Sequence, residues 1–268
     1  MEPNPADERR SATWRGSLFL FLCAPLILGW RWLPVPHPVF MVVVLLAATL
    51  FALRLEGRSA AALGLDPSWR RARELLGGLI GGALLIGMMA LLIGLVLPFP
   101  WVRNPRFDVV AAGLTFAALL CGNAVEELVF RGYSFDRLIA GIGHWKAQLV
   151  TALVFAVFHV AQGWSWQVAL MGTTVGSLLF GLVFVRWQSV PAATGVHAAV
   201  NWVRDLLLED PPKATTLFAP LAPRPWTGSE QLRAQACFSI VVLLACAALA
   251  VSIRRRGLPG LAKPSRHR

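Results

Sequence analysis

Three short motifs carry side chains capable of acid–base chemistry in an otherwise apolar sequence. The first reads Glu126-Glu127-Leu-Val-Phe-Arg131. Glu127 and Arg131 are four residues apart, the spacing of an ion pair on one face of a helix. Glu126 is turned about 100° away from Glu127 on that helix, so we do not expect it to pair with Arg131 in the same manner. One carboxylate thus has a built-in partner, while the other is relatively free to serve as a general base or acid.

The other two motifs carry imidazole and carboxamide groups. His159 follows Phe155 by four residues at the end of an apolar run, and His197 and Asn201 share a helix face at the same spacing. Each alone would suit a hydrogen bond between membrane helices. Together they match a hydrolytic site, because a carboxylate can take a proton from water, an imidazole can position that water, and both N–H types can donate to an oxyanion.

Composition places these groups in a membrane protein. Of the 268 residues, 56% are hydrophobic and 15% are charged, against about 45–50% and about 25% in soluble domains. The formal charge is +11, but the arginines lie mostly between apolar runs, as in the cytoplasmic loops of membrane proteins. We therefore expect a lipid bilayer and no nucleic acid among its partners. The four cysteines lie in apolar runs without the paired spacing of a zinc or disulfide framework.

The positioning elements are expected to be membrane helices, since runs of roughly 20 apolar residues are long enough to span a bilayer. The predicted fold class is an all-α polytopic membrane helix bundle with a four-helix catalytic core in spans four to seven. The eight predicted spans are 16–33, 39–55, 75–97, 109–137, 145–160, 168–187, 190–208 and 236–253.

Three regions follow from these spans. Residues 1–15 form an N-terminal segment, 16–253 the membrane domain with its core at about 107–208, and 254–268 a basic tail. Arginine and lysine favour the two ends and the second, fourth and sixth loops, which predicts cytoplasmic N- and C-termini.

The connections and small residues give further expectations. Segment 56–74 is predicted to lie on the membrane surface, with a helix starting at Asp66-Pro67-Ser68 and Trp69 as an anchor, and the proline-rich segment 209–233 is predicted to be irregular. Two groups of small residues predict close helix packing: Gly77, Gly78, Gly81 and Gly82 in one, and Gly172 and Gly176 in the other.

The three motifs resemble those of a known family. EExxxR at Glu126–Arg131, FxxxH at Phe155–His159 and HxxxN at His197–Asn201 are similar, in order and spacing, to the motifs of the CAAX-processing and bacteriocin-protection (Abi) family of intramembrane proteases. The resemblance covers about residues 114–206. The flanking spans add only a general eight-span plan.

The resemblance implies an endopeptidase that works without a covalent intermediate. We expect no cofactor, with a divalent metal such as zinc left as an open alternative. By position, Glu126 would activate a water held with the help of His159, and His197 and Asn201 would donate to the oxyanion. Glu127 and Arg131 would orient the site, with Phe155 in support. Which of the two glutamates is the base stays open, since paired carboxylates titrate together. The implied substrate is a membrane-anchored protein or peptide, and the expected location is a bacterial cytoplasmic (inner) membrane.

Three other interpretations remain open at this point. A metal-dependent hydrolase is one, because histidine and glutamate are zinc ligands, although neither histidine belongs to an HExxH motif and Asn201 is a poor ligand. A nucleophilic Cys121 is the second. The third is a non-enzymatic scaffold or immunity protein, in which the polar cluster only holds the helices together.

Overall fold

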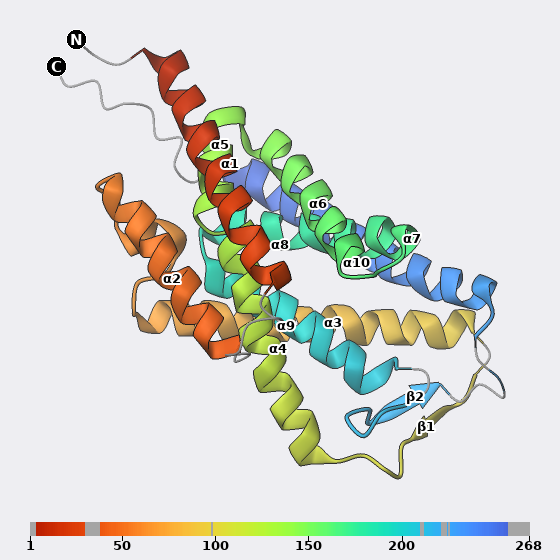
Figure 1. Ribbon diagram of the computed structural model, residues 1–268. Coiled ribbons are helices and arrows are strands. Elements are labelled where there is room, and N and C mark those ends of the chain that lie inside the picture. Colours follow the sequence, from red (N-terminus) through yellow and green to blue (C-terminus); the bar gives the residue numbers. More distant parts are fainter. Residues whose placement is uncertain are drawn as a thin grey trace.

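A computed structural model describes residues 4–29, 38–97, 99–209, 212–220, 224 and 226–256. Figure 1 shows that these residues form an almost entirely helical molecule. Its helices are α1 (Pro5–Gly29), α2 (Pro38–Leu55), α3 (Trp69–Val96), α4 (Val109–Phe130), α5 (Tyr133–Ile142), α6 (His144–Ala161), α7 (Trp166–Val168), α8 (Thr174–Trp187), α9 (Val190–Leu207) and α10 (Gly228–Arg256), with a 3₁₀ turn η2 (Ala60–Leu63) and a π-helical turn η3 (Ala169–Thr173).

The predicted all-α polytopic membrane bundle is confirmed. Seven helical stretches in the described part are long and apolar enough to cross a membrane. One of them joins α4 and α5, and another runs from α7 through η3 to α8. Helices suit this environment because every backbone group must find a partner within the protein.

The predicted seventh span is less apolar than the other predicted spans. It forms α9, which is long enough to span but does not count among the seven apolar stretches. Its second half carries His197, Asn201, Arg204 and Asp205, which lower its hydropathy. Nevertheless α9 is enclosed, since Val190 and residues 192–200 are buried between α3, α4 and α8. A polar helix is thus held at the centre of the bundle by apolar neighbours.

Helices α1, α3 and α10 begin before their predicted spans. Helix α1 begins at Pro5 rather than at 16, and α10 begins at Gly228 rather than at 236. Both carry acidic residues in the first turn, where the helix dipole favours negative charge. The predicted end of the first span at 33 lies outside the described residues. The start signal at Asp66-Pro67-Ser68 is confirmed, because α3 begins at Trp69, whose side chain is exposed.

The segment predicted to be irregular also contains a strand. β2 (Phe218–Pro220) pairs antiparallel with β1 (Trp101–Arg103), and Val102 lies opposite Ala219. The carboxamide nitrogen of buried Asn104 donates to the backbone oxygens of Lys213 and Thr216. These bonds join the α3–α4 connection to the α9–α10 connection. The pairing joins residues more than a hundred positions apart, so local pattern could not predict it.

The predicted fourth span, 109–137, is two helices rather than one. Helix α4 ends at Phe130, and α5 starts at Tyr133 after Arg131 and Gly132. A β-carbon on Gly132 would clash with the carbonyl oxygen of Leu128. The sharp change of direction therefore requires glycine at this position, and it leaves Arg131 at the end of α4.

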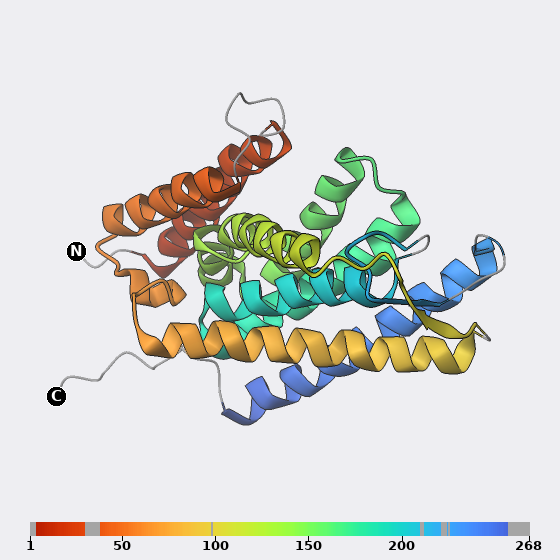
Figure 2. The ribbon, with the colours of Figure 1, turned by 90° about the horizontal axis from the view of Figure 1, so that it is seen from below.

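Close packing of α3 against α9 fixes the central helix. A β-carbon on Gly78 or Gly82 would meet the backbone of α9, and one on Gly195 would meet the backbone of α3. Figure 2 shows the two helices running along each other. Glycines at these three positions let the helix backbones touch.

The other small residues do not pack in this way. Gly77 and Gly81 have open space around them, so one of the two overlapping pairs in α3 makes the contact. Around Gly172 and Gly176, a β-carbon would meet only the side chains of Gln235 and Phe180. The prediction of close backbone packing at Gly172 and Gly176 is therefore wrong. Next to Gly172 lies the side chain of Gln235 from α10, and next to Gly176 lies the ring of Phe180 from α8 itself.

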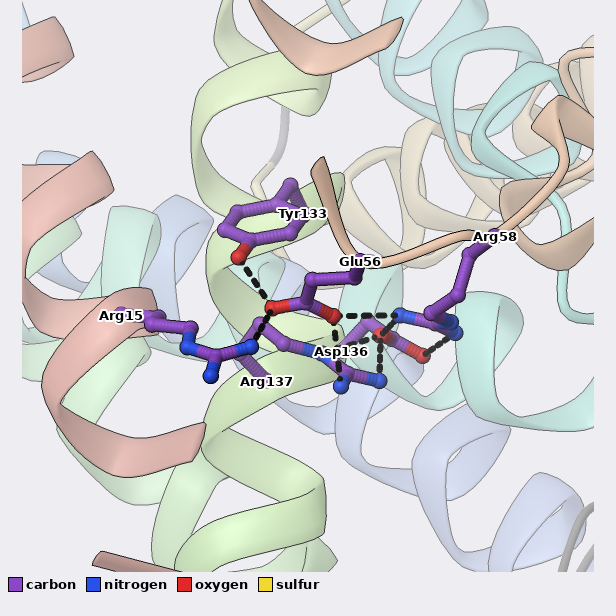
Figure 3. Close-up of polar contacts among 6 residues, drawn as sticks. All are labelled: Arg15, Glu56, Arg58, Tyr133, Asp136 and Arg137. Atoms are coloured by element: carbon purple, nitrogen blue, oxygen red, sulfur yellow. Dashed lines mark hydrogen bonds and ion pairs between the residues drawn. The ribbon is translucent and has the colours of Figure 1, made fainter. Parts of the chain in front are cut away.

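A polar network joins α1, α5 and the turn after α2. The carboxylate of Glu56 accepts hydrogen bonds from Tyr133, Arg15 and Arg137 (Figure 3). Asp136 accepts from Arg58 and from Arg137. Burial alone would raise the pKa of Glu56, but the hydrogen bonds from Tyr133 and Arg15 and the charge of Arg137 outweigh it and lower that pKa below its usual value.

The two ends of the described chain lie on the same side. In Figure 1 the start of α1 and the end of α10 lie away from the β1–β2 sheet. Figure 2, which looks from below, separates them from the sheet in the same way. This agrees with an arrangement in which both termini are on one side of the membrane. The cytoplasmic orientation itself stays a prediction.

The glycine contacts predict unequal effects of two neighbouring substitutions. In Gly82→Ala the new β-carbon would lie 2.5 Å from the oxygen of Val196, so we expect a loss of about 1–3 kcal/mol of stability. Gly81→Ala meets open space and should be neutral or stabilising by about 0.5–1 kcal/mol. Thermal unfolding in detergent measures both variants. Equal midpoints would contradict the proposed role of Gly82.

Candidate active site

The predicted site residues come together on three helices. Glu126 and Glu127 are on α4, His159 is at the end of α6, and His197 and Asn201 are on α9. A cavity of about 740 Å³ is lined by residues that include Glu126, Phe155, His159, His197 and Asn201. Glu127 and Arg131 lie behind its wall, with side chains 0% and 1% exposed. The cavity also reaches Glu209 and Lys213, beyond the end of α9.

One carboxylate oxygen of Glu127 interacts with two side chains. Its Oε1 lies 3.2 Å from Nη1 of Arg131 and 2.8 Å from Nδ1 of His197. The ion pair predicted from the spacing of Glu127 and Arg131 is confirmed. Arg131 also donates from Nη2 to the hydroxyl and backbone oxygens of Ser177 on α8, and its guanidinium lies 4.7 Å from the ring centre of Phe155. A buried guanidinium needs this many partners because desolvation is costly.

Glu126 has a different environment from its neighbour. Its side chain is 20% exposed, and its Oε2 lies 3.8 Å from Nε2 of His197, too far for a hydrogen bond. That oxygen has no hydrogen-bond partner among the described residues. Oε2 of Glu127 is likewise without a partner among the described residues. The two glutamates differ because Glu126 lines the cavity, whereas Glu127 lies behind its wall and is engaged through Oε1 by Arg131 and His197.

His159 turns one ring nitrogen toward its own helix. Nδ1 lies 2.9 Å from the backbone oxygen of Phe155. A carbonyl oxygen can only accept, so Nδ1 donates, and in the neutral ring Nε2 keeps a lone pair. The rings of Phe155 and Trp164 lie edge-on to the imidazole at 4.4 and 5.1 Å between centroids. These contacts fix the ring plane.

His197 links the two glutamates. Because Glu127 is paired with Arg131 and accepts, Nδ1 of His197 donates to it. Nε2 then faces Glu126. The ring also stacks on Phe180 of α8, with centroids 4.1 Å apart and planes 21° apart. His197 is held from two sides, and its orientation is set by an acidic partner behind it.

Asn201 has a partner that the motif analysis missed. Its Nδ2 donates to Oδ1 of Asn123 on α4 at 2.9 Å. Asn123 precedes Glu127 by four residues, as His197 precedes Asn201, and this matched spacing is the signal that could have identified it. Ser177 and Phe180 were missed as well, and nothing in their spacing relates them to the motifs.

The positions of the cysteines and of the possible metal ligands test the nucleophilic-cysteine and metal-hydrolase interpretations. Cys23, Cys237 and Cys246 are buried and unpaired, and Cys121 is not among the residues that line the cavity. A nucleophilic Cys121 therefore has no support from its position. Among the described residues, no three His, Cys, Asp or Glu side chains gather as metal ligands would.

A comparison with protein families fits this arrangement. Residues 108–203 match the family described as "Rce1-like: Type II CAAX prenyl endopeptidase Rce1-like". The chain contains an Rce1-like region. The match spans all three motifs and confirms the predicted resemblance to the CAAX-processing proteases. A search of curated proteins finds no match to this chain. The Rce1-like region begins at the N-cap of α4 and ends within α9, so it contains the whole polar cluster.

The buried ion pair predicts a strong effect of its removal. Arg131→Ala would leave the carboxylate of Glu127 with His197 as its remaining partner, and we expect a loss of about 3–5 kcal/mol and low membrane abundance. Arg70→Ala is the matched control, because Arg70 pairs with Glu74 at the same spacing but is 70% exposed. It should cost no more than about 0.5 kcal/mol. Abundance and unfolding midpoints that match between the two variants would contradict this assignment.

Proposed function

We propose that the protein is an intramembrane endopeptidase that hydrolyses a peptide bond with a water activated by Glu126. The observation that carries this proposal is the unequal state of the two glutamates. Glu127 lies behind the cavity wall and is engaged by Arg131 and His197, while Glu126 lines the cavity and accepts no hydrogen bond from the described residues. A general base must be within hydrogen-bond reach of the proton that it abstracts, and Glu126 meets this requirement for a water in the cavity.

His159 is proposed to hold that water together with Glu126. Its Nδ1 is engaged by the carbonyl of Phe155, which leaves Nε2 as an acceptor for one water proton. Glu126 then takes the other water proton as the water oxygen attacks the substrate carbonyl. The proton passes from Glu126 to the departing amine, so the carboxylate is regenerated without a covalent enzyme intermediate.

His197 and Asn201 are proposed to stabilise the oxyanion of the tetrahedral intermediate. Asn201 retains one N–H of its carboxamide after donating to Asn123. His197 provides an N–H from Nε2 when its ring is protonated. In that state its charge and that of Arg131 balance the charges of Glu126 and Glu127. Charge balance within a buried cluster avoids the large cost of an isolated ion.

The proposed substrate is a membrane-anchored protein or peptide. The matching family is described as a CAAX prenyl endopeptidase, and the cavity lies among helices that are apolar enough to span a bilayer. A lipid-modified peptide would bring its scissile bond to the site from the membrane. We further propose that the termini are cytoplasmic, from the distribution of arginine and lysine, and that the membrane is a bacterial inner membrane.

The assignment of the base predicts the behaviour of Glu126→Gln. This change keeps the shape of the side chain but removes the proton acceptor, so turnover of a farnesylated, internally quenched CAAX peptide should fall at least about 10²-fold. Protein abundance and unfolding midpoint should stay close to wild type, because Glu126 makes no hydrogen bond from Oε2. An abundant Glu126→Gln variant that still cleaves the peptide at the wild-type rate would contradict the assignment of Glu126 as the base.

The oxyanion assignment predicts independence from metal. His197 and Asn201 suit donation to an oxyanion, and Asn is a poor zinc ligand. We expect elemental analysis of purified, active protein to find no stoichiometric transition metal. Activity should survive dialysis against a strong chelator. Loss of activity that one specific divalent ion restores would establish the metal-dependent hydrolase.

A further inference from the structure

Helices α4 and α9 face each other through two matched side-chain pairs. Glu127 bonds to His197, and one helical turn away Asn123 bonds to Asn201, at 2.8 and 2.9 Å. The partner number falls as the α4 number rises, so the helices are antiparallel here. The first pair belongs to the EExxxR and HxxxN motifs. In the second pair Asn201 belongs to a motif, but Asn123 does not.

Only one of the two polar atoms of the Asn123 carboxamide has a hydrogen-bond partner among the described residues. Its side chain is buried, with 4% of the residue exposed, and its Oδ1 accepts from Asn201. Its Nδ2 is also buried and has no hydrogen-bond partner among the described residues. Buried donors are rarely left without a partner in folded proteins. Since Asn123 lines the cavity, a molecule bound in the cavity can supply the missing acceptor.

The position of Asn123 on α4 places it next to the proposed base. Relative to Asn123, Glu126 is turned about 60° to one side and Glu127 about 40° to the other, as 3.6 residues per turn require. Asn123 therefore lies between the directions of the two glutamates, one turn earlier along the helix. Its neighbour across the cavity wall is Asn201, one of the two proposed oxyanion donors.

We propose that Asn123 is a further catalytic residue, whose Nδ2 donates a hydrogen bond to the substrate carbonyl oxygen as it becomes an oxyanion. This inference rests on the proposed function. Asn123 also holds Asn201 through Oδ1, so both carboxamides present N–H groups to the same oxygen. Preorganised donors of this kind stabilise charge that develops in the transition state.

The simpler alternative is that Asn123 only positions Asn201. The two roles use different atoms of one carboxamide, so an isosteric change separates them. Asn123→Asp keeps an oxygen that accepts from Nδ2 of Asn201, but replaces the donor nitrogen with a second acceptor. Asn123→Ala removes both groups. A residue that only positions Asn201 would tolerate the aspartate and not the alanine.

The test uses the full-length protein in proteoliposomes with the farnesylated quenched peptide as probe. We expect both Asn123 variants to lower kcat by about 10²–10³-fold, the usual effect of losing an oxyanion donor, with little change in KM. Gln148→Ala is the control, because Gln148 is a buried carboxamide on α6 that is absent from the cavity lining and donates to the backbone of Leu178. It should lower stability while kcat per folded molecule stays at the wild-type value.

The results separate this inference from the function on which it rests. Near wild-type kcat in Asn123→Asp, together with loss of activity in Asn123→Ala, would reduce Asn123 to a positioning residue and overturn the proposal. A raised KM at unchanged kcat would also overturn it, because ground-state binding would then explain the effect. Activity that persists in Glu126→Gln would instead contradict the proposed protease mechanism.

Discussion

A carboxylate without access to water sets the main constraint on this structure. Glu127 is fully buried, and an isolated charge there would be prohibitively costly. Its Oε1 meets this constraint by accepting from both Arg131 and His197. The bond from His197 ties α4 to α9, and Arg131, held at the end of α4, donates in turn to Ser177 of α8. The charge of one glutamate thus determines how three helices of the core meet.

The same constraint explains the break after α4. Arg131 follows the last residue of α4, and Gly132 allows the chain to turn immediately afterwards into α5. Helix α5 is in turn held by the network of Glu56, Tyr133 and Arg137. The end of α4 is therefore fixed from both sides: by buried charge in the membrane core, and by a partly exposed ionic network next to it.

Local spacing was sufficient to predict some of this arrangement. The pair Glu127–Arg131 follows from helix periodicity, and the three motifs identified His159, His197 and Asn201 as neighbours. The partners Asn123, Ser177 and Phe180 depend on how α4, α8 and α9 pack, which no local pattern records. The β1–β2 pairing was missed for the same reason. Hydropathy predicted the seven apolar stretches found among the described residues. It could not predict that a break at Gly132 divides one of them into α4 and α5.

The glycine-lined contact between α3 and α9 also bears on how the protein is assembled. Helix α9 is not apolar enough to count among the candidate spans, so its own partition into lipid is weak. Helices α3 and α4 precede it in the chain and offer a glycine surface and a carboxylate partner. Biogenesis therefore has a required order, in which the helix that carries His197 and Asn201 is retained in the bilayer through helices already inserted. The candidate site is complete only after that late step, because two of its side chains come from α9.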